Sequence, residues 1–328
     1  MRLLVTGGLG FIGSNFILKI LRENEDISII NVDAEFSGSN KKNLVSVEND
    51  DRYEFVKGNI TNRRLMEKLI DRCDSVVNFA AESFVDKSIN NAEPFLVSNF
   101  RGAYTILDII TKKKKRMIQI STDEVFGSLS EGTADENSKL NPSNPYAATK
   151  AAAELLINSY STTYETDVII TRCTNNYGPR QFPEKLIPKA ILLLKNKKNI
   201  PIYGNGKNVR DWIFVEDHCD AIYKVLIQGK AGESYNISGK NEITNLQIID
   251  EITSFSGISK DVIEFVEDRP GHDFRYSLDS SKITNELGWK PKIGFKEGMK
   301  KTIEWYNENS DIFESSNKEI LKSTPWKV

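Results

Sequence analysis

The sequence contains little cysteine and almost no histidine. Its three cysteines, Cys73, Cys173 and Cys219, are far apart, and His218 and His272 are the only histidines among 328 residues. An odd number of scattered cysteines excludes a disulfide framework, and the spacing of a zinc site is missing. We therefore predict no metal centre and expect the chemistry to rest on other side chains.

Long apolar runs and a strong net charge are also lacking. No apolar run approaches the length of about 18 residues that a membrane helix needs, and the formal net charge is −2. The first residues already form a predicted strand and leave no room for a targeting segment. We expect a soluble cytoplasmic protein with no membrane and no nucleic-acid partner. The basic block KKKKR at residues 112–116 is interpreted as the solvated end of a helix.

Short apolar strands alternate with amphipathic helices through the first half of the chain. Strands are predicted at residues 3–6, 27–32, 53–57, 75–79, 117–121 and 167–172, and helices at residues 13–21, 63–70, 94–110 and 145–164. This alternation is typical of an α/β protein with a doubly wound parallel sheet of the Rossmann type. Such sheets bind their ligands at the carboxyl ends of the strands.

The pattern loosens after about residue 175, where prolines interrupt it. Further helices are predicted at residues 188–194, 215–227, 245–255, 280–287 and 295–306. We therefore predict a first domain at residues 1–174, a smaller α/β lobe at residues 175–308 and a polar tail at residues 309–328. Some segments of the lobe are expected to return to the first sheet.

A glycine-rich turn follows the first predicted strand. Gly7, Gly10 and Gly13 have the spacing GxxGxxG and enclose Phe11 and Ile12. Such glycines permit a tight turn, a close approach to a pyrophosphate and close helix–strand packing, although a turn without a ligand can have the same composition. Asp33, at the end of the second strand, is suited to accept hydrogen bonds from ribose hydroxyls and would repel a 2′-phosphate, so NAD is predicted in preference to NADP.

Two more strand ends are predicted to lie in the same cleft. Asn59 and Ile60 follow the third strand and are expected near the adenine. Ala80 and Ala81 follow the fourth, where small residues let the backbone pass close to a cofactor, although alanine is also ordinary helix or turn composition.

Tyr146 and Lys150 lie four residues apart at a predicted helix start and hence on one helix face. A nearby ammonium is expected to lower the pKa of the phenol, so that a phenolate removes a hydroxyl proton while hydride leaves the same carbon. The alternative is a surface pair. The hydroxyl-bearing strand end at Ser121 and Thr122 favours the catalytic interpretation.

Several longer motifs carry a resemblance to a known family. They are AAES (80–83) with VDKSI (85–89), STDEV (121–125), PYAATK (145–150), NNYGP (175–179) with QFPEKLIP (181–188), GKNVRDW (206–212) and DRPGHD (268–273). With these motifs, residues 1 to about 305 resemble the extended short-chain dehydrogenase/reductase family, and within it the dTDP-glucose 4,6-dehydratases.

The adjacent carboxylates Asp123 and Glu124 distinguish this group from epimerases of the same superfamily, which do not have the pair. Elimination of water across C5 and C6 of a hexose needs a base and an acid, and two carboxyls can serve if their pKa values differ. The resemblance implies that Asp123 protonates the leaving hydroxyl, that Glu124 takes the C5 proton and that Thr122 binds the C4 oxygen. NAD would take hydride from C4 and return it to C6.

The resemblance also implies a nucleotide-sugar site, a homodimer and further cofactor contacts. The substrate contacts would be Ser83, Thr122, Asn175, Lys185, Leu186, Pro201, Tyr203, Arg210, Asn245, Arg269 and His272, and the added cofactor contacts Ser98 and Asn176. Arginine suits a diphosphate because its fork donates two parallel hydrogen bonds; an ion pair with Asp211 or Glu216 is the alternative for Arg210. His218 is interpreted as structural. The helices at residues 94–110 and 145–164 would form the dimer interface.

Four positions depart from the family pattern. Phe79 and Phe84 stand where histidine is usual, Phe126 where tyrosine is usual and Asn59 where aspartate is usual. None of these changes removes a group that the dehydration requires. An epimerase or decarboxylase of the same superfamily would leave the acid pair without a role, and a non-catalytic dinucleotide sensor would not need the tyrosine and lysine.

Overall fold

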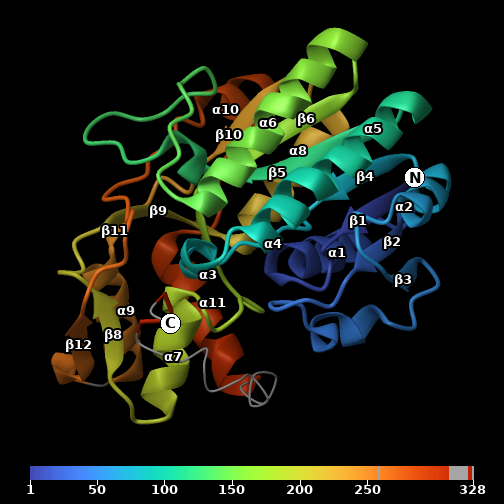
Figure 1. Ribbon diagram of the computed structural model, residues 1–328. Helices are drawn as coiled ribbons and strands as arrows, with labels where there is room; N and C mark the ends of the chain where they lie inside the picture. Colours follow the sequence, from blue (N-terminus) through green and yellow to red (C-terminus); the bar gives the residue numbers. More distant parts are fainter. Residues whose placement is uncertain (258, 310–323, 327–328) are drawn as a thin grey trace.

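A seven-stranded sheet forms the centre of the protein (Figure 1). The computed structural model describes residues 1–257, 259–309 and 324–326. The strands are β1 (Arg2–Thr6), β2 (Ser28–Asp33), β3 (Tyr53–Lys57), β4 (Ser75–Asn78), β5 (Arg116–Thr122), β6 (Val168–Cys173) and β10 (Ser234–Ile237). Their order is β10-β6-β5-β4-β1-β2-β3, and every neighbouring pair is parallel. The predicted doubly wound α/β fold is confirmed.

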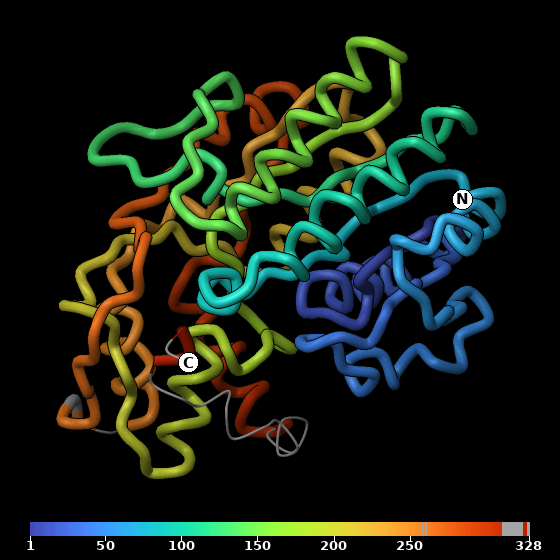
Figure 2. Tube along the Cα trace, in the orientation of Figure 1, coloured from blue at the N-terminus to red at the C-terminus, as the bar shows by residue number. Residues whose placement is uncertain are grey.

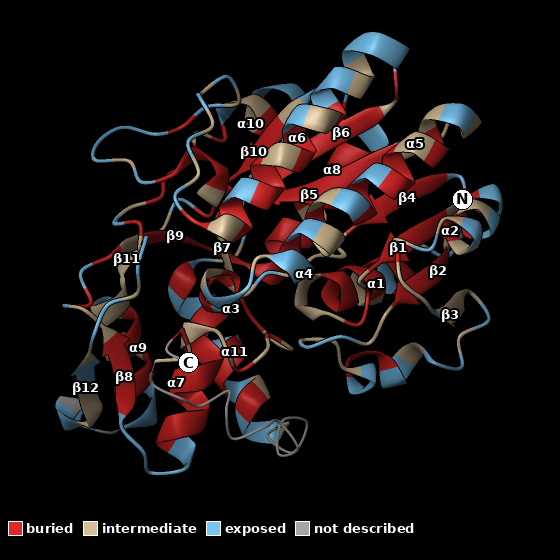
Figure 3. Cartoon of the chain, in the orientation of Figure 1, coloured by how far each residue is buried: buried red, intermediate tan, exposed pale blue. Residues whose placement is uncertain are grey.

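Both faces of this sheet are covered by helices, as parallel sheets require. One face packs against α1 (Phe11–Glu23), α8 (Val215–Gln228) and α10 (Ser281–Leu287), and the other against α2 (Arg63–Asp71), α5 (Ala103–Lys113) and α6 (Pro145–Tyr164). Neighbouring strand residues such as Leu3 and Leu4 therefore enter different hydrophobic clusters. The buried strands between exposed helix surfaces are visible in Figure 3.

The strand order reverses beside β1. From β1 the chain moves to β2 and β3, and then returns to place β4 on the opposite side of β1. The carboxyl ends of β1 and β4 therefore diverge into loops on opposite sides of a crevice, the position where such sheets bind ligands.

A smaller part of the protein is built around two short sheets. The first joins β7 (Asn175–Tyr177), β9 (Val209–Phe214) and β11 (Glu242–Thr244), and the second joins β8 (Ile200–Tyr203) and β12 (Ile263–Val266). Helices α7 (Leu186–Lys195), α9 (Asn245–Ser256) and α11 (Phe295–Glu308) pack with them around their own hydrophobic cluster. Between these elements, α8 and β10 return to the large sheet, which can be followed in Figure 2. The domain boundaries at residues 174 and 308 remain predictions.

The predicted helix at residues 94–110 consists of three pieces. It is divided into α4 (Glu93–Phe95), a π-helical segment η2 (Leu96–Gly102) and α5. Asn99, in the π-helical segment, receives a hydrogen bond from the Glu82 amide and donates to the Glu82 carbonyl and to Thr149. The wider turn thus ties this helix to the loop after β4, and π-turns often occur at functional sites.

Four short helical segments and part of the tail complete the described part of the chain. Helix α3 (Val85–Asn90) follows β4, and the 3₁₀ segments η1 (Lys41–Val47) and η3 (Asp123–Phe126) follow β2 and β5. Another 3₁₀ turn, η4 (Lys260–Val262), precedes β12. Most of the predicted polar tail lies outside the described residues, but Trp326 is buried against the ring of Tyr203, with 4.5 Å between the ring centroids.

Candidate active site

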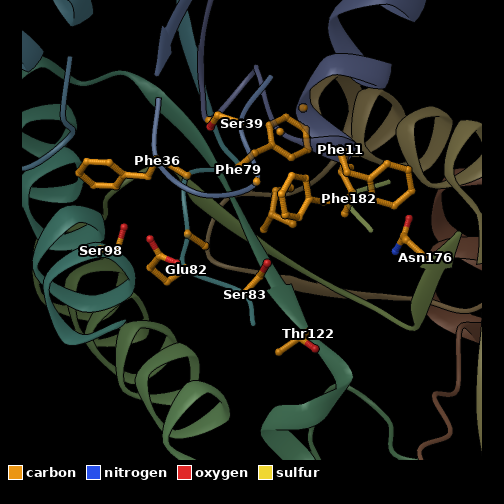
Figure 4. Close-up of a pocket in the computed structure, with 18 of the residues that line it drawn as sticks. Phe11, Phe36, Ser39, Phe79, Glu82, Ser83, Ser98, Thr122, Asn176 and Phe182 are labelled. Atoms are coloured by element: carbon orange, nitrogen blue, oxygen red, sulfur yellow. The ribbon is translucent and has the colours of Figure 1, made fainter. Parts of the chain in front are cut away.

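Two adjoining cavities open at the carboxyl ends of the strands. The large cavity, of about 310 Å³, is lined by the loops after β1, β2, β3, β4, β5 and β6, and part of its lining is drawn in Figure 4. The small cavity, of about 170 Å³, lies between these loops and the smaller sheets. Both are lined by Glu124, Asn175, Asn176, Gln181 and Lys185, so the two cavities meet there.

The glycine turn forms one wall of the large cavity. Gly7 has a φ of +68°, and a Cβ at Gly13 would lie 2.6 Å from the carbonyl oxygen of Gly7. Gly10 is the N-cap of α1, so the free amides of the first turn of α1 face the cavity. Side chains larger than hydrogen are excluded where the chain turns most sharply, which leaves the backbone open to an anionic ligand.

Asp33 ends β2 beside this turn and is almost fully buried. Its carboxylate accepts hydrogen bonds from the amides of Leu9 and Glu35 and from the hydroxyl of Ser39. A carboxylate has about four acceptor positions, so one remains for a ligand in the cavity. The group is held rigidly where the prediction placed a ribose contact.

The structure brings every predicted cofactor residue to the large cavity. These are Gly7, Gly10, Phe11, Ile12, Gly13, Asp33, Asn59, Ile60, Ala80, Ala81, Ser98, Tyr146, Lys150 and Asn176. Asn59 accepts hydrogen bonds from the amide and hydroxyl of Thr61 through its Oδ1, so the oxygen is fixed by its own turn. Their roles as ligands remain predictions.

Thr122, Tyr146 and Lys150 lie at the inner end of the large cavity. Thr122 ends β5, and the side chain of Asn144 caps α6, which fixes Tyr146 in its first turn. Proline at residue 145 begins the helix without losing a needed donor. The strand end and the capped helix therefore place a hydroxyl, a phenol and an ammonium against one space.

The pKa of Tyr146 is raised in this structure, whereas the sequence predicted that Lys150 would lower it. Burial, followed by the charge of Glu124, raises the pKa of Tyr146 well above its usual value, although the Thr122 hydroxyl acts in the opposite direction. Lys150 donates to the carbonyl of Ile120, and burial lowers its own pKa to about 8. Desolvation therefore outweighs the expected Coulombic effect of the ammonium in this structure.

Asp123 and Glu124 are adjacent but lie in different environments. Asp123 is 3% exposed, receives a hydrogen bond of 3.1 Å from the Thr122 hydroxyl and has no partner for Oδ2. Burial and, next, the charge of Glu124 raise the pKa of Asp123 well above its usual value. Glu124 Oε2 instead accepts from Asn144 Nδ2 at 3.3 Å and lies 3.4 Å from the Tyr276 hydroxyl. This asymmetry favours a protonated Asp123 and gives the two carboxyl groups different surroundings.

The predicted substrate residues converge from separate elements. Leu186, Pro201, Tyr203, Arg210, Asn245, Arg269 and His272 line the small cavity, Asn175 and Lys185 line both cavities, and Ser83 and Thr122 line the large one. Lys185 donates to the Ser83 carbonyl, and burial lowers the pKa of this lysine. Substrate contact by these residues remains a prediction, but their convergence is a property of the fold.

Arg210 does not pair with Asp211 or Glu216 in the described part of the chain. Its guanidinium donates to the carbonyl oxygens of Val209, Asp273 and Phe274 and lies 4.3 Å from the centre of the Tyr276 ring. Tyr276 in turn donates to Asp273. Arg210 therefore orders the loop that carries Tyr276 to Glu124.

Several residues of the site were missed at the sequence level. Asp86 is buried, forms an ion pair of 2.7 Å with Arg269 and accepts from the Tyr203 hydroxyl at 3.1 Å. Both Asp86 and Tyr276 lie in or just after motifs that carried the resemblance, VDKSI and DRPGHD. Their positions were therefore visible, but the partners that give them a role are distant in the sequence.

The two histidines have different surroundings. His218 is fully buried, its Nδ1 lies 2.8 Å from Oδ1 of Asn176, and burial lowers its pKa to about 3. His272 lies 2.6 Å from Asp268, and burial, followed by the charge of Arg269, lowers its pKa to about 4. His218 therefore has a structural role beside the site, because its ring orients Asn176, which lines both cavities.

The three phenylalanines that depart from the family pattern lie in apolar or cationic surroundings. Phe79 packs against Phe16 on α1, with 5.3 Å between centroids. Phe84 has the ammonium groups of Lys87 and Lys185 within 5.1 and 5.6 Å of its ring centre. The guanidinium of Arg172, in a buried pair with Glu154, lies 5.0 Å from the Phe126 ring. A histidine at position 84 would meet two cations.

The described residues, 1–257, 259–309 and 324–326, contain neither a membrane-spanning helix nor a cluster of metal-binding side chains. No helix there is both long and apolar enough to span a bilayer. No group of three or more histidine, cysteine, aspartate and glutamate residues is arranged to hold a metal ion there.

The fold and these two cavities define a Rossmann-type protein with a dinucleotide-like crevice and an adjoining site for a second ligand. Within this class the chain belongs to the GDP-mannose 4,6 dehydratase family, whose family model matches residues 4–302.

Three named proteins are similar to this chain over more than nine tenths of its length. The low-salt glycan biosynthesis protein Agl12 of Haloferax volcanii is 47% identical over 93% of this chain and 98% of its own. The dTDP-glucose 4,6-dehydratase of Streptomyces niveus is 44% identical over 94% of both chains. The solved dTDP-glucose 4,6-dehydratase of Streptomyces venezuelae, with NAD bound, is 43% identical and superposes with a TM-score of 0.94 over 96% of this chain and 99% of that one. The predicted resemblance is confirmed.

Proposed function

We propose that this protein is an NAD-dependent dehydratase that converts a nucleotide-activated glucose, dTDP-glucose, to the 4-keto-6-deoxy sugar. The observation that carries the proposal is the acid pair where the two cavities meet: Asp123 is buried and its pKa is raised by that burial, whereas Glu124 accepts a hydrogen bond from Asn144 and lies beside Tyr276. The chemistry of an elimination needs this division between an acid and a base. The similarity to named dTDP-glucose 4,6-dehydratases supports the same reaction.

The large cavity fits NAD. A Cβ at Gly13 would fill the space against Gly7, the amides at the start of α1 are open to a pyrophosphate, and Asp33 retains an acceptor position. When bound, NAD supplies a hydride acceptor for C4 of the sugar and later a hydride donor for C6. Ile12 and Asn176 are further residues that would hold it.

The protein side chains would then handle the protons. Tyr146, assisted by Thr122 and Lys150, removes the C4 hydroxyl proton. The resulting ketone acidifies the C5 proton, which Glu124 accepts while Asp123 protonates the departing C6 hydroxyl, and Glu124 would return the proton to C5 when C6 receives hydride. Burial raises the pKa of Tyr146, and the Thr122 hydroxyl acts in the opposite direction. Thr122 is therefore the neighbouring group that would favour the phenolate.

Substrate binding is assigned to the small cavity. Arg210 and Arg269 would hold the diphosphate, while Pro201 and Tyr203 would line the pocket for the base. His272, Asn245 and Leu186 would complete this site, and Ser83, Asn175 and Lys185 would contact the sugar.

We further propose that the enzyme is a cytoplasmic homodimer. Leu96 and Tyr104, on η2 and α5, and Leu155 and Tyr164, on α6, are large apolar side chains exposed in the single chain. Pairing of these helices with those of a second copy would cover them. Three free, buried cysteines suit a reducing compartment. Sedimentation of Leu155→Glu tests the dimer, since a monomeric variant is expected.

A panel of dTDP-, UDP-, CDP- and GDP-glucose tests the reaction and the base preference. We expect dTDP-glucose to yield a product lighter by one water in the mass spectrum, and Tyr146→Phe to yield none. A product of unchanged mass would indicate an epimerase, and wild-type product from Tyr146→Phe would contradict the catalytic assignment.

A further inference from the structure

Three polar side chains join segments beside the large cavity, which Ser37 lines directly. Glu184 Oε1 lies 2.8 Å from the Lys87 ammonium and 3.3 Å from the Ser37 hydroxyl, and Lys87 also donates to Ser37 at 3.1 Å. Each of the three residues is thus bonded to both others. We call Ser37, Lys87 and Glu184 the latch.

The latch connects segments that are far apart in the sequence. Ser37 lies in the loop after β2, Lys87 in α3, and Glu184 in the loop before α7. The loop after β2 also lines the large cavity through Phe36, and the loop before α7 lines it through Phe182. Figure 4 shows these two rings on different sides of the cavity. Because Ser37 and Lys87 are exposed, the latch lies between the solvent and the cavity.

The charges of the latch favour a closed state. The Glu184 side chain is only 7% exposed, against 45% for Lys87, so separation from Lys87 would leave a poorly solvated carboxylate without its ionic partner. The Phe84 ring lies 5.1 Å from the Lys87 ammonium and holds it from one side. The Lys185 ammonium, next to Glu184 in the other loop, lies 5.6 Å from the centre of the same ring, so separation of α3 from this loop requires loss of the ion pair and of this second cation–π contact.

We propose that the latch closes over bound NAD and slows its release, so that Ser37, Lys87 and Glu184 are positioning residues for cofactor retention. This rests on the proposed function, in which the same NAD molecule is oxidised again at the end of each turnover. A dinucleotide between Asp33 and Tyr146 would lie in the cavity that the loops carrying Ser37 and Glu184 also line, through Phe36 and Phe182. Release then requires the loops to separate.

The test measures the rate at which labelled NAD leaves the purified enzyme when excess unlabelled NAD is added. We expect Lys87→Met and Glu184→Gln each to accelerate release by roughly tenfold or more, as loss of one partner of a poorly solvated charge pair mainly raises dissociation rates. Ser37→Ala, which removes only a neutral donor, should have a smaller effect. Lys87→Arg keeps the charge and should retain slow release.

Two further variants make the test specific. The exchange Lys87→Glu with Glu184→Lys should restore much of the slow release that each single change loses, which a general loss of stability would not produce. Lys230→Met removes an exposed pair with Glu286 that lies outside both cavities and should release NAD at the wild-type rate.

The outcomes separate the latch from the proposed function. Wild-type release rates in both Lys87→Met and Glu184→Gln, with melting temperatures unchanged, would overturn the latch while leaving NAD binding intact. Failure of the wild-type protein to bind NAD at all would overturn the proposed function itself. Equal acceleration in the double exchange and the single variants would also count against the latch.

Discussion

The two cavities are built in different ways. The large cavity takes its essential features from backbone: the turn at Gly7, the start of α1 and the ends of parallel strands. The small cavity is made by side chains that pair across different elements, Arg210 with Tyr276 and Arg269 with Asp86. A backbone site depends on a few contiguous residues, whereas a side-chain site depends on many long-range contacts.

This difference explains how one fold serves several reactions. The backbone cavity suits any ligand with a pyrophosphate, because amides and a helix terminus recognise charge and not identity. Selectivity is assigned to the side chains of the small cavity and to the acid pair between the two. Changes in one cavity should therefore leave the other largely intact, and four predictions test this separation.

The largest effect is expected where the cavities meet. Glu124→Gln and Asp123→Asn remove the proposed base and acid while keeping size, and each should lower the rate of dehydration by about 10²- to 10⁴-fold. Bound NAD should remain at wild-type occupancy. The rate is measured by mass spectrometry of the sugar product and the occupancy by release of NAD on denaturation; loss of NAD from either variant would refute the separation.

The next largest effect is expected on NAD binding in the large cavity. In Gly13→Val the new Cβ would lie 2.6 Å from the Gly7 carbonyl oxygen and 2.9 Å from the Gly8 Cα, so the turn must open. We expect NAD affinity to fall by about 100-fold or more, since a misfit of this kind costs several kcal/mol. Binding is measured by calorimetry. Gly294→Ala, whose Cβ would meet nothing within 4 Å, is the matched control and should bind normally.

A smaller effect is expected in the small cavity, on binding of the nucleoside diphosphate and not on binding of NAD. Arg210→Met removes charge-assisted hydrogen bonds to the loop that carries Tyr276. Affinity for a nucleoside diphosphate should fall by roughly 10- to 100-fold, while NAD occupancy stays unchanged. Equilibrium binding of dTDP measures the first quantity. An unchanged dTDP affinity would show that the diphosphate lies elsewhere.

The smallest effect concerns His218, which supports a residue of both cavities. In the folded protein its pKa is about 3, below the ordinary value of 6.5. Below pH 6.5 the unfolded chain therefore binds more protons than the folded chain, so the free energy of unfolding decreases as the pH is lowered towards about 3. From pH 7 to pH 5, His218 should cost about 2 kcal/mol of unfolding free energy. Urea unfolding of wild type and His218→Asn should therefore converge as the pH falls; parallel curves would contradict a buried neutral histidine.

The sequence predicted the parts of the site that local rules control. The glycine turn, the strand ending in Asp33 and the capped helix with Tyr146 and Lys150 each follow from a few neighbouring residues. The helix at residues 145–164 has the predicted bounds, since Asn144 and a following proline mark its start. The π-helical segment η2 was missed, because its wider turn depends on Asn99 reaching the loop after β4.

Contacts between residues that are far apart in the sequence could not be predicted by these local rules. Asp86 has a role only because Tyr203 and Arg269, more than a hundred residues later, reach it. The pKa of Tyr146 was predicted in the wrong direction, because the sequence shows the nearby lysine but not the burial of both groups. The latch likewise joins two loops and helix α3, which are far apart in the sequence.

The sequence by itself determined the chemical groups: a glycine turn, a phenol with a lysine, and two adjacent carboxylates. It could do so because these groups lie within single turns or strand ends, where spacing fixes geometry. Only the tertiary structure decided how Asp123 and Glu124 differ. Burial isolates the first, while Asn144 and the distant Tyr276 hold the second, and desolvation depends on everything that packs around a group and not on its neighbours in the chain.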